Sequence, residues 1–354
     1  MTAFESLPAE LALEIFSLCI PQYPECVHSA ITSPARLTQI CRHWRDIVLS
    51  GPSLWRAIRL RFRNVTPIVI SKQIAKLHAF LARSGSCPIV IHLEGNQGFA
   101  ESNKLLEAVM QYSSRWEYLS LDVDRDILEH ILAAAPFPAL RSLELLGKGS
   151  TMDDLPRIDL SSETAPLLRA ISFCDISCTS ATSLPWTNLT TLNLVHKTAR
   201  ECVQLLAFAT SVVSARFSLR RGVGPTQLGN PEPVPHIVHP NLRTLVLDTL
   251  YFWVSEVPPE DVFSMMTLPR LRRLQVFDSI LDRTYPGAPD PDSGVQRIVR
   301  FLARSECELE ELRLQSHSSR LTIPLEEYTE TFAGTTVRHV AQMEGYTFGW
   351  MGWS

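Results

Sequence analysis

The sequence lacks the features of a secreted or membrane-inserted chain. Its eight cysteines have no framework spacing, and several lie in apolar stripes, where a reduced thiol behaves as a small hydrophobic side chain. No stretch reaches the roughly 18 unbroken apolar residues of a membrane span. The N-terminal residues, MTAFESLPAE, include neither the basic nor the apolar region of a signal peptide. We therefore expect a protein of the cytoplasm or the nucleus with no membrane partner.

An excess of charge of one sign is also missing. The 33 Lys and Arg residues are dispersed and nearly balance the 37 Asp and Glu residues, which gives a net charge of −4. This balance argues against a nucleic-acid partner. Hydrophobic residues make up 45% of the 354 residues and charged residues 20%, as in folded domains. The length corresponds to about two domains.

Sequence motifs of known enzyme classes are absent as well. The chain contains no GxxxxGK[ST], GxGxxG, HExxH or GxSxG pattern. Cys174 and Cys178 are spaced like two zinc ligands but need two more, and nothing in the sequence links them to His236 or His239. We interpret these residues as ordinary thiols and loop histidines. The sequence therefore predicts no catalytic residue, metal ligand, cofactor or small-molecule ligand.

The N-terminal stretch predicts a first helix over about residues 6–20. Ser6 is a favourable N-cap, Pro8 lies in the first turn, and Pro21 ends the helix. One apolar stripe is formed by Leu7, Leu11, Ile15 and Leu18, and a neighbouring one by Leu13, Phe16 and Ile20. A helix that is apolar over more than half of its circumference needs cover on two sides.

A second helix is predicted over about residues 33–49, opened by Ser33 and Pro34 and broken by Gly51 and Pro52. Its expected buried stripe consists of Leu37, Ile40, Cys41, Trp44, Ile47 and Val48, and a short element with Leu54 and Trp55 follows. About fifty residues form only a marginal core. Either a partner covers these helices, or they pack on the rest of the chain as a cap; periodicity leaves both alternatives open.

The segments LPAELALEIF, LTQICRHWRDI and GPSLWRAI, in this order, resemble the F-box, from Leu7 to about Ile58. The connector over residues 21–33 is longer than in compact members, as is common in fungal ones. The resemblance implies a module over residues 1–60 that docks on the Skp adaptor of a cullin-based ubiquitin ligase, whose partner subunits would carry the ubiquitin-transfer chemistry. It implies that five residues face the adaptor, Leu7, Pro8, Leu11, Ile15 and Leu18, and that four more join or support that interface, Cys41, Trp44, Leu54 and Trp55.

The remainder repeats the phrase L-x-x-L-x-L or a degenerate form of it eight times, with middle positions at 119, 143, 171, 192, 215, 245, 274 and 312. Most of the intervals are close to the roughly 20–29 residues of a leucine-rich repeat, a family that this part resembles. Helical spacing lies between the phrases, at about 71–83, 126–135, 198–209 and 294–303. The expected fold is therefore α/β: a small all-helical F-box, then an irregular solenoid over 61–354, with parallel strands on the concave face and helices on the convex face.

In such an array the residues between the leucines face the concave surface, because side chains alternate along a strand. The candidate contacts of a protein substrate are Tyr118, Asp122, Glu144, Asn193, Arg216, Asp248, Arg273, Phe277 and Arg313. Surface loops are expected at about 221–240 and 281–294, which are rich in Pro and Gly, and an aromatic end cap at 346–353. The leading hypothesis is a substrate-recognition subunit of the ligase. The alternative is a non-catalytic scaffold with no ligase assembly.

Overall fold

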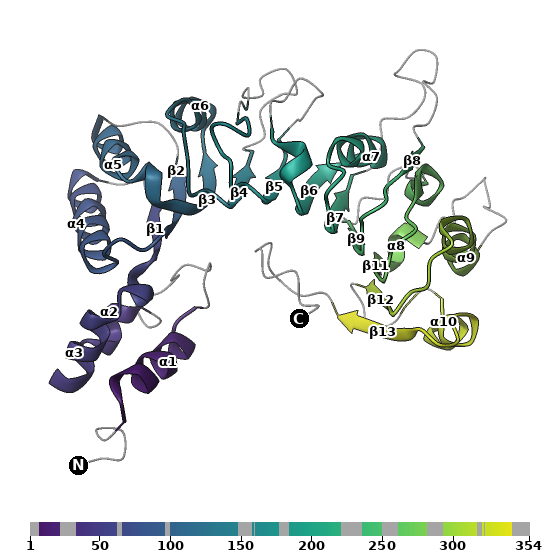
Figure 1. The fold of residues 1–354 in the computed structure, drawn as a ribbon, viewed down its shortest axis with the longest axis horizontal. Helices are drawn as coiled ribbons and strands as arrows, with labels where there is room; N and C mark the ends of the chain where they lie inside the picture. The colour runs from purple at the N-terminus through teal and green to yellow at the C-terminus, as the bar shows by residue number, and fades with distance from the viewer. Residues whose placement is uncertain are drawn as a thin grey trace. The chain divides into compact units, whose positions relative to one another are not determined.

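A computed structural model describes residues 7–21, 33–61, 66–95, 100–147, 158, 160–176, 184–220, 236–249, 261–281, 293–316, 321 and 323–341. The chain forms two compact units. The first comprises Met1–Leu168 with Thr182–Pro185, and the second comprises Arg169–Ala181 with Trp186–Ser354. In both units, helices alternate with parallel strands (Figure 1).

The first unit begins with helices α1 (Ala9–Cys19), α2 (Pro34–Leu37) and α3 (Arg42–Ser50) and the 3-10 helix η1 (Pro52–Trp55). Its strands pair in parallel in the order β1-β2-β3-β4. They are β1 (Ala57–Arg61), β2 (Ile89–Gly95), β3 (Trp116–Val123) and β4 (Ser142–Leu146). The intervening elements are α4 (Pro67–Arg83), α5 (Ala100–Met110), η2 (Ser113–Arg115) and α6 (Arg125–Ala133).

The second unit has a parallel sheet in the order β5-β6-β7-β9-β11-β12-β13. Its strands are β5 (Ala170–Cys174), β6 (Thr191–Lys197), β7 (Ser214–Leu219), β9 (Thr244–Asp248), β11 (Arg273–Phe277), β12 (Glu311–Ser316) and β13 (Thr336–Ala341). The short strands β8 (Ile237–Val238) and β10 (Met266–Thr267) pair with each other. The helices are η3 (Trp186–Asn188), α7 (Ala199–Phe208), η4 (Val262–Met265), α8 (Asp278–Leu281), α9 (Gly294–Ser305) and α10 (Leu325–Thr331).

All eight leucine phrases form strands of these sheets, β3 to β7, β9, β11 and β12, which confirms that part of the sequence prediction. The middle residue of every phrase, from Leu119 to Leu312, has 0% exposure. The reason is the strict alternation of side chains along a strand, which places every second residue on the covered face. The helices predicted between the phrases correspond to α4, α6, α7 and α9, although α4 begins earlier than expected, at Pro67.

The prediction of one helix over residues 33–49 is wrong, because this stretch forms two helices, α2 and α3. Cys41 is extended, with φ −154° and ψ 173°, and its Sγ accepts a hydrogen bond from the Trp44 N–H at 3.4 Å. Cys41 therefore caps α3 instead of lying inside a helix. As a consequence, Ile40 is 56% exposed and Cys41 is exposed, whereas the rest of the expected stripe is buried or half-buried.

Other predicted boundaries also shift. Helix α1 is shorter than residues 6–20, and Ser6 lies outside the described residues. Of the two expected loops, residues 221–235 and 282–292 lie outside the described residues, as does the expected end cap at 346–353. Elements α5, α10 and β13 were not predicted. No helix in the described part of the chain combines the length and the apolar character needed to cross a bilayer.

Candidate functional site

Helix α1 has one face that is fully covered. Ala12 and Phe16 have 0% exposure, and the Phe16 ring lies 4.7 Å from the Trp44 ring of α3, centroid to centroid. Leu13 lies against Gly51, where an added Cβ would come within 2.4 Å of the Leu13 Cδ2 atom. Gly51 thus permits the chain after α3 to approach α1 closely. This face is the core of the N-terminal helical region.

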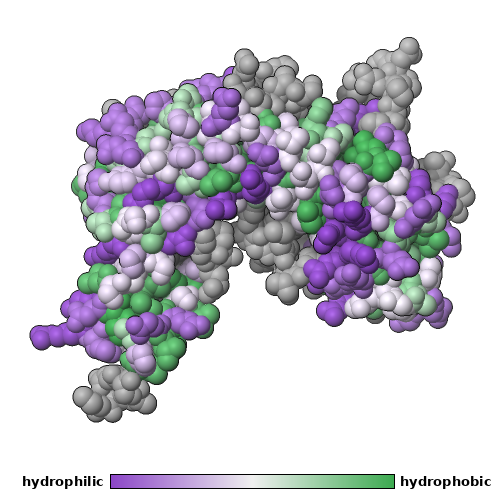
Figure 2. Space-filling view, viewed as in Figure 1, coloured by the Kyte–Doolittle hydropathy of each residue, from purple (hydrophilic) through white to green (hydrophobic). Residues whose placement is uncertain are grey.

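The neighbouring face of α1 is open to solvent. Leu11, Ile15 and Leu18, which we call the α1 stripe, are 48%, 39% and 71% exposed. Pro8 is exposed, and Leu7 is partly buried at the start of this face. Figure 2 shows hydrophobic side chains at the surface over α1 to α3. Large apolar residues exposed together are typical of a binding surface, and the sequence predicted a contact role for all five of these residues.

Trp55 connects the N-terminal helical region to α4. Its ring is fully buried, and its Nε1 donates a hydrogen bond to the Val48 carbonyl at 3.0 Å. The Phe80 ring of α4 meets it edge-on at 5.1 Å, and the Arg83 guanidinium lies 4.3 Å from its centroid. Leu54 is also buried, at 5% exposure. Of the four residues expected to join or support the interface, Leu54 and Trp55 are therefore core residues, whereas Cys41 is exposed and Trp44 half-buried.

On the strands of the first unit, the candidate substrate residues make lateral contacts with one another. The register aligns Arg59, His92, Ser120 and Glu144 across β1 to β4. The Tyr118 hydroxyl donates to Glu144 Oε2 at 2.7 Å. Tyr118 and Glu144 are only 4% and 9% exposed. Burial raises the pKa of Glu144, although hydrogen bonds from Tyr118 and Ser120 and the charge of Arg59 act in the opposite direction.

Two arginines on β1 share one carboxylate partner on β2. Arg59 and Arg61 both pair with Glu94 on β2, and the Arg61 Nε lies 2.6 Å from Glu94 Oε2. Burial raises the pKa of Glu94, but the hydrogen bonds and charges of the two arginines outweigh it, so that the pKa lies below its ordinary value. Asp122, the third candidate residue of this unit, is partly exposed on β3.

In the second unit the candidate polar residues are likewise joined from strand to strand. Arg216 on β7 donates to Asp248 on β9, with Nε at 2.8 Å from Oδ2. Asn193 Nδ2 donates to Ser172 Oγ at 2.8 Å. The Arg313 Nε lies 2.8 Å from Glu311 Oε1 on its own strand. Asn193 and Ser172 have equal register on neighbouring strands, which lie about 4.8 Å apart. Arg216 instead reaches diagonally to Asp248, because its register partner on β9 is Val246.

Five of the nine candidate target contacts are covered by neighbouring parts of the chain. The buried residues are Tyr118, Glu144, Asn193, Asp248 and Phe277, which are 2–9% exposed. Four are only partly buried: Asp122, Arg216, Arg273 and Arg313. The alternation rule correctly separates the two faces of each strand, but it does not show which positions neighbouring strands cover.

Comparison with known proteins bears on the N-terminal region alone. No curated protein matches the chain. The F-box-like family model matches residues 4–61, which begin before α1 and end at the last residue of β1. The helical region that carries the α1 stripe is therefore an F-box-like domain.

Proposed function

We propose that the F-box-like domain docks on a Skp-type adaptor and, through it, on a cullin, as the substrate-recognition subunit of an SCF-type ubiquitin ligase. The observation that carries this proposal is the exposure of Leu11, Ile15 and Leu18 within the matched domain. Burying apolar surface contributes roughly 25 cal/mol per Å². An adaptor that covered the three side chains would therefore gain a substantial part of its binding free energy from α1.

The exposure of the α1 stripe also favours docking over a mere capping role. A helix that only capped a sheet would bury its apolar residues against that sheet, yet Leu18 is 71% exposed. In contrast, the contacts of Trp55 with Val48, Phe80 and Arg83 fix the domain to the neighbouring α4. The domain thus presents α1 from a packed base, with no need for α1 to refold on binding.

For the strands we propose a leucine-rich-repeat-like array that holds a protein target. The recurrence of the eight phrases and the parallel pairing of their strands support this part of the proposal. The candidate contacts that keep some solvent exposure are Asp122, Arg216, Arg273 and Arg313, whereas the other five are buried. The array would act by proximity, holding target lysines near a ubiquitin-conjugating enzyme supplied by partner subunits.

Binding of the purified full chain to a purified Skp-type adaptor tests the proposal. The variant Ile15→Ala/Leu18→Ala truncates two residues of the α1 stripe, and Ile68→Ala is the matched control. Ile68 is 69% exposed, much like Leu18, but lies on α4 outside the matched domain. Loss of buried anchors of this kind costs about 2 kcal/mol, which is roughly thirtyfold in Kd. We expect that loss for the double variant and unchanged binding for the control.

Circular dichroism and urea unfolding establish that each variant is folded. If the wild-type chain is folded and does not bind the adaptor, the docking proposal is wrong, and the chain is better described as a scaffold with no ligase assembly. Equal losses for the double variant and for Ile68→Ala would also overturn the assignment of the α1 stripe.

A further inference from the structure

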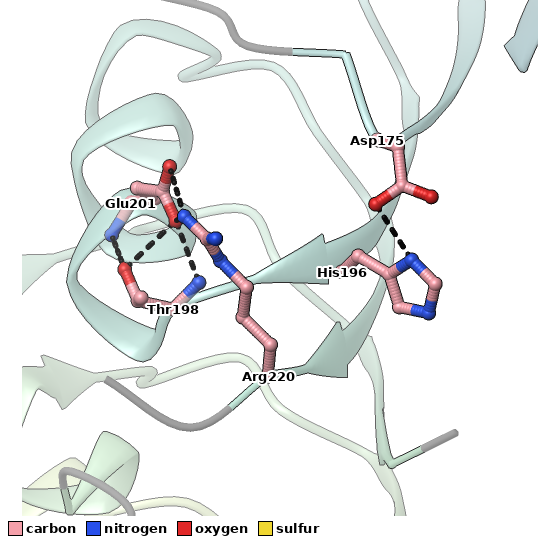
Figure 3. Close-up of polar contacts among 5 residues, drawn as sticks. All are labelled: Asp175, His196, Thr198, Glu201 and Arg220. Carbon is pink, nitrogen blue, oxygen red and sulfur yellow. Dashed lines mark hydrogen bonds and ion pairs between the residues drawn. The ribbon is translucent and has the colours of Figure 1, made fainter. Parts of the chain in front are cut away.

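Three metal-binding side chain types meet at the carboxyl ends of β5 and β6. Cys174, Asp175 and His196, which we call the β5–β6 cluster, each offer a donor atom within 4.8 Å of the others. His196 Nδ1 lies 2.6 Å from Asp175 Oδ1, and Cys174 Sγ lies 3.8 Å from Asp175 Oδ2. Figure 3 shows the imidazole of His196 and the carboxylate of Asp175 pointing toward each other from the two strand ends.

The backbone is irregular at both strand ends where these side chains come together. His196 lies at a register shift between β6 and β7, where a bulge re-aims the side chain. Its φ is +60°, and that of Asp175 is +53°. Among the described residues, the one other non-glycine residue with positive φ is Glu306, which ends α9. Positive φ is uncommon for non-glycine residues, although Asp and His adopt it more readily than most, and uncommon backbone conformations cluster at functional sites.

The distances are close to those that a tetrahedral zinc ion imposes. Zinc bonds of about 2.3 Å to sulfur and 2.0–2.2 Å to oxygen and nitrogen set ligand separations of roughly 3.6 Å for S···O and 3.3 Å for N···O. The separation of 3.8 Å between Cys174 Sγ and Asp175 Oδ2 agrees with the first value, whereas His196 Nδ1 lies beside the other carboxylate oxygen, Oδ1. A rotation of the Asp175 carboxylate is therefore needed to bring one oxygen onto the ion together with both other ligands. The nitrogen–oxygen distance of 2.6 Å corresponds to a hydrogen bond, which would open by less than about 1 Å.

We propose that Cys174, Asp175 and His196 bind one zinc ion through three protein ligands, with the fourth position left to water. Thiolate, imidazole and carboxylate are the donors that zinc uses in proteins. Cys174 and His196 are partly buried and Asp175 is exposed, so that an ion can enter from solvent. A site with one open position fits this exposure better than a closed structural site with four protein ligands.

The nearby carboxylate of Glu201 belongs to a different arrangement. Thr198 and Glu201 form a capping box at the start of α7, and Arg220 pairs with the same carboxylate at 3.3 Å (Figure 3). Burial raises the pKa of Glu201, but the Thr198 backbone hydrogen bond and the charges of Lys197 and Arg220 lower it below its ordinary value. Glu201 is thus committed to the helix start, and we do not include it among the zinc ligands.

This ligand set differs from the one considered in the sequence. Cys178 lies outside the described residues. His236 bonds to the Ser264 carbonyl at 3.0 Å, and His239 bonds to the Ala209 carbonyl at 3.0 Å. The two histidines therefore have local structural roles. Cys174 instead meets His196, which is 22 residues away in the chain and one strand away in the sheet.

Metal titration of the reduced full chain tests the site. Zinc affinity is measured by calorimetry, and Co²⁺ is used as a spectroscopic probe because thiolate coordination produces a charge-transfer band in the near ultraviolet. The test variants are Cys174→Ser and His196→Gln. Their matched controls are Cys307→Ser, a cysteine of similar burial in the same unit, and His236→Gln.

We expect one zinc ion per chain and loss of the cobalt–thiolate band in Cys174→Ser. Zinc affinity should fall in both test variants by more than the roughly 10–100-fold that substitutions behind the ligands produce, and the controls should retain wild-type affinity. The proposal is overturned if both test variants keep wild-type affinity, or if the controls lose as much as they do. Because the readout is metal binding by chains with an unchanged circular dichroism spectrum, the result is independent of adaptor docking.

Discussion

The F-box-like domain exposes several large apolar side chains, whereas the strands bury several polar ones. On α1 the large apolar residues Leu11, Ile15 and Leu18 are exposed. On the strands the polar residues Glu144 and Asp248 are buried, at 9% and 4% exposure. Most soluble proteins show the reverse, with apolar residues inside and charged ones outside. The difference teaches that polarity alone does not identify the surface that awaits a partner.

What separates the two regions is whether neighbouring groups already satisfy the side chain. Glu144 accepts a hydrogen bond from Tyr118, and Asp248 Oδ2 accepts from Arg216, so these buried groups are partly compensated by neighbouring strands. Asp248 Oδ1 has no hydrogen-bond partner among the described residues. A buried polar group that is hydrogen-bonded carries little penalty. The α1 stripe has no comparable compensation, since apolar surface gains only when it is covered. We therefore propose docking at α1 and no target contact at the buried strand positions.

The largest expected effect is a difference in the free energy of unfolding between variants on the two faces of α1, measured in the free protein. Phe16→Ala empties a position with 0% exposure beside Trp44, and such truncations cost about 3–5 kcal/mol in the free energy of unfolding. Leu18→Ala, at a position that is 71% exposed, should change that free energy by less than about 0.5 kcal/mol. Urea unfolding of the two variants measures the contrast.

A similar loss for both variants would mean that Leu18 is covered in the free protein, and the comparison between the two faces would fail. Adaptor binding provides the converse readout, because Leu18→Ala should weaken binding in a chain of nearly unchanged stability. The two measurements together separate a core residue from a docking residue on one helix.

The second prediction tests whether the ion pair between Arg216 and Asp248 stabilises the fold. Arg216→Met removes the guanidinium that donates to Asp248, and the remaining carboxylate has a side chain only 6% exposed. An uncompensated buried charge costs about 3 kcal/mol. The double variant Arg216→Met/Asp248→Leu should recover most of that loss, since apolar replacements of a buried pair are often neutral. Thermal and urea unfolding measure both.

If Arg216→Met lowers the free energy of unfolding by less than about 1 kcal/mol, the pair is not a structural element. Arg216 would then remain a candidate target contact without a structural role. A double variant that is no more stable than the single variant would show that the loss arises from packing of the arginine stem and not from the charge.

The strands were the most predictable part of the fold. Each leucine phrase specifies a buried face through its period of two, and this pattern is local, so eight phrases in sequence predict eight strands. Helix α7 was predictable from the helical spacing of its apolar residues, which is also a local pattern, and the structure adds a capping box of Thr198 and Glu201 at its start. Strand β13, TVRHVA, lacks the leucine phrase and was missed.

Features that depend on register or on a single backbone torsion could not be predicted. The pairing of Tyr118 with Glu144 requires knowing that residues 118 and 142 face each other on neighbouring strands. The break before α3 depends on the extended backbone of Cys41, which its side chain permits but no periodicity requires. The meeting of Asp175 with His196 depends on positive φ at both residues, which the sequence does not specify, because non-glycine residues adopt it only occasionally.

The smallest expected effect concerns the protonation of Glu144. Burial raises its folded-state pKa above the ordinary value of 4.5, so the folded state binds the proton more tightly than the unfolded chain does. The stability that this proton contributes is fully present below pH 4.5 and is lost as the pH rises through the folded-state pKa. The loss amounts to about 1.4 kcal/mol for every pH unit between the two pKa values.

Glu144→Gln removes this titration and retains a hydrogen-bonding side chain of the same size. Urea unfolding at a series of pH values from 4.5 upward should show a shallower decline in stability for Glu144→Gln than for the wild type. Tyr118→Phe is the opposite control, because it removes a hydrogen bond that lowers the Glu144 pKa and so should extend the decline to higher pH. Identical pH profiles for all three chains would show that Glu144 is solvated in the folded state. The strand face around Tyr118 and Glu144 would then be accessible to solvent, and Glu144 would again be a candidate for target binding.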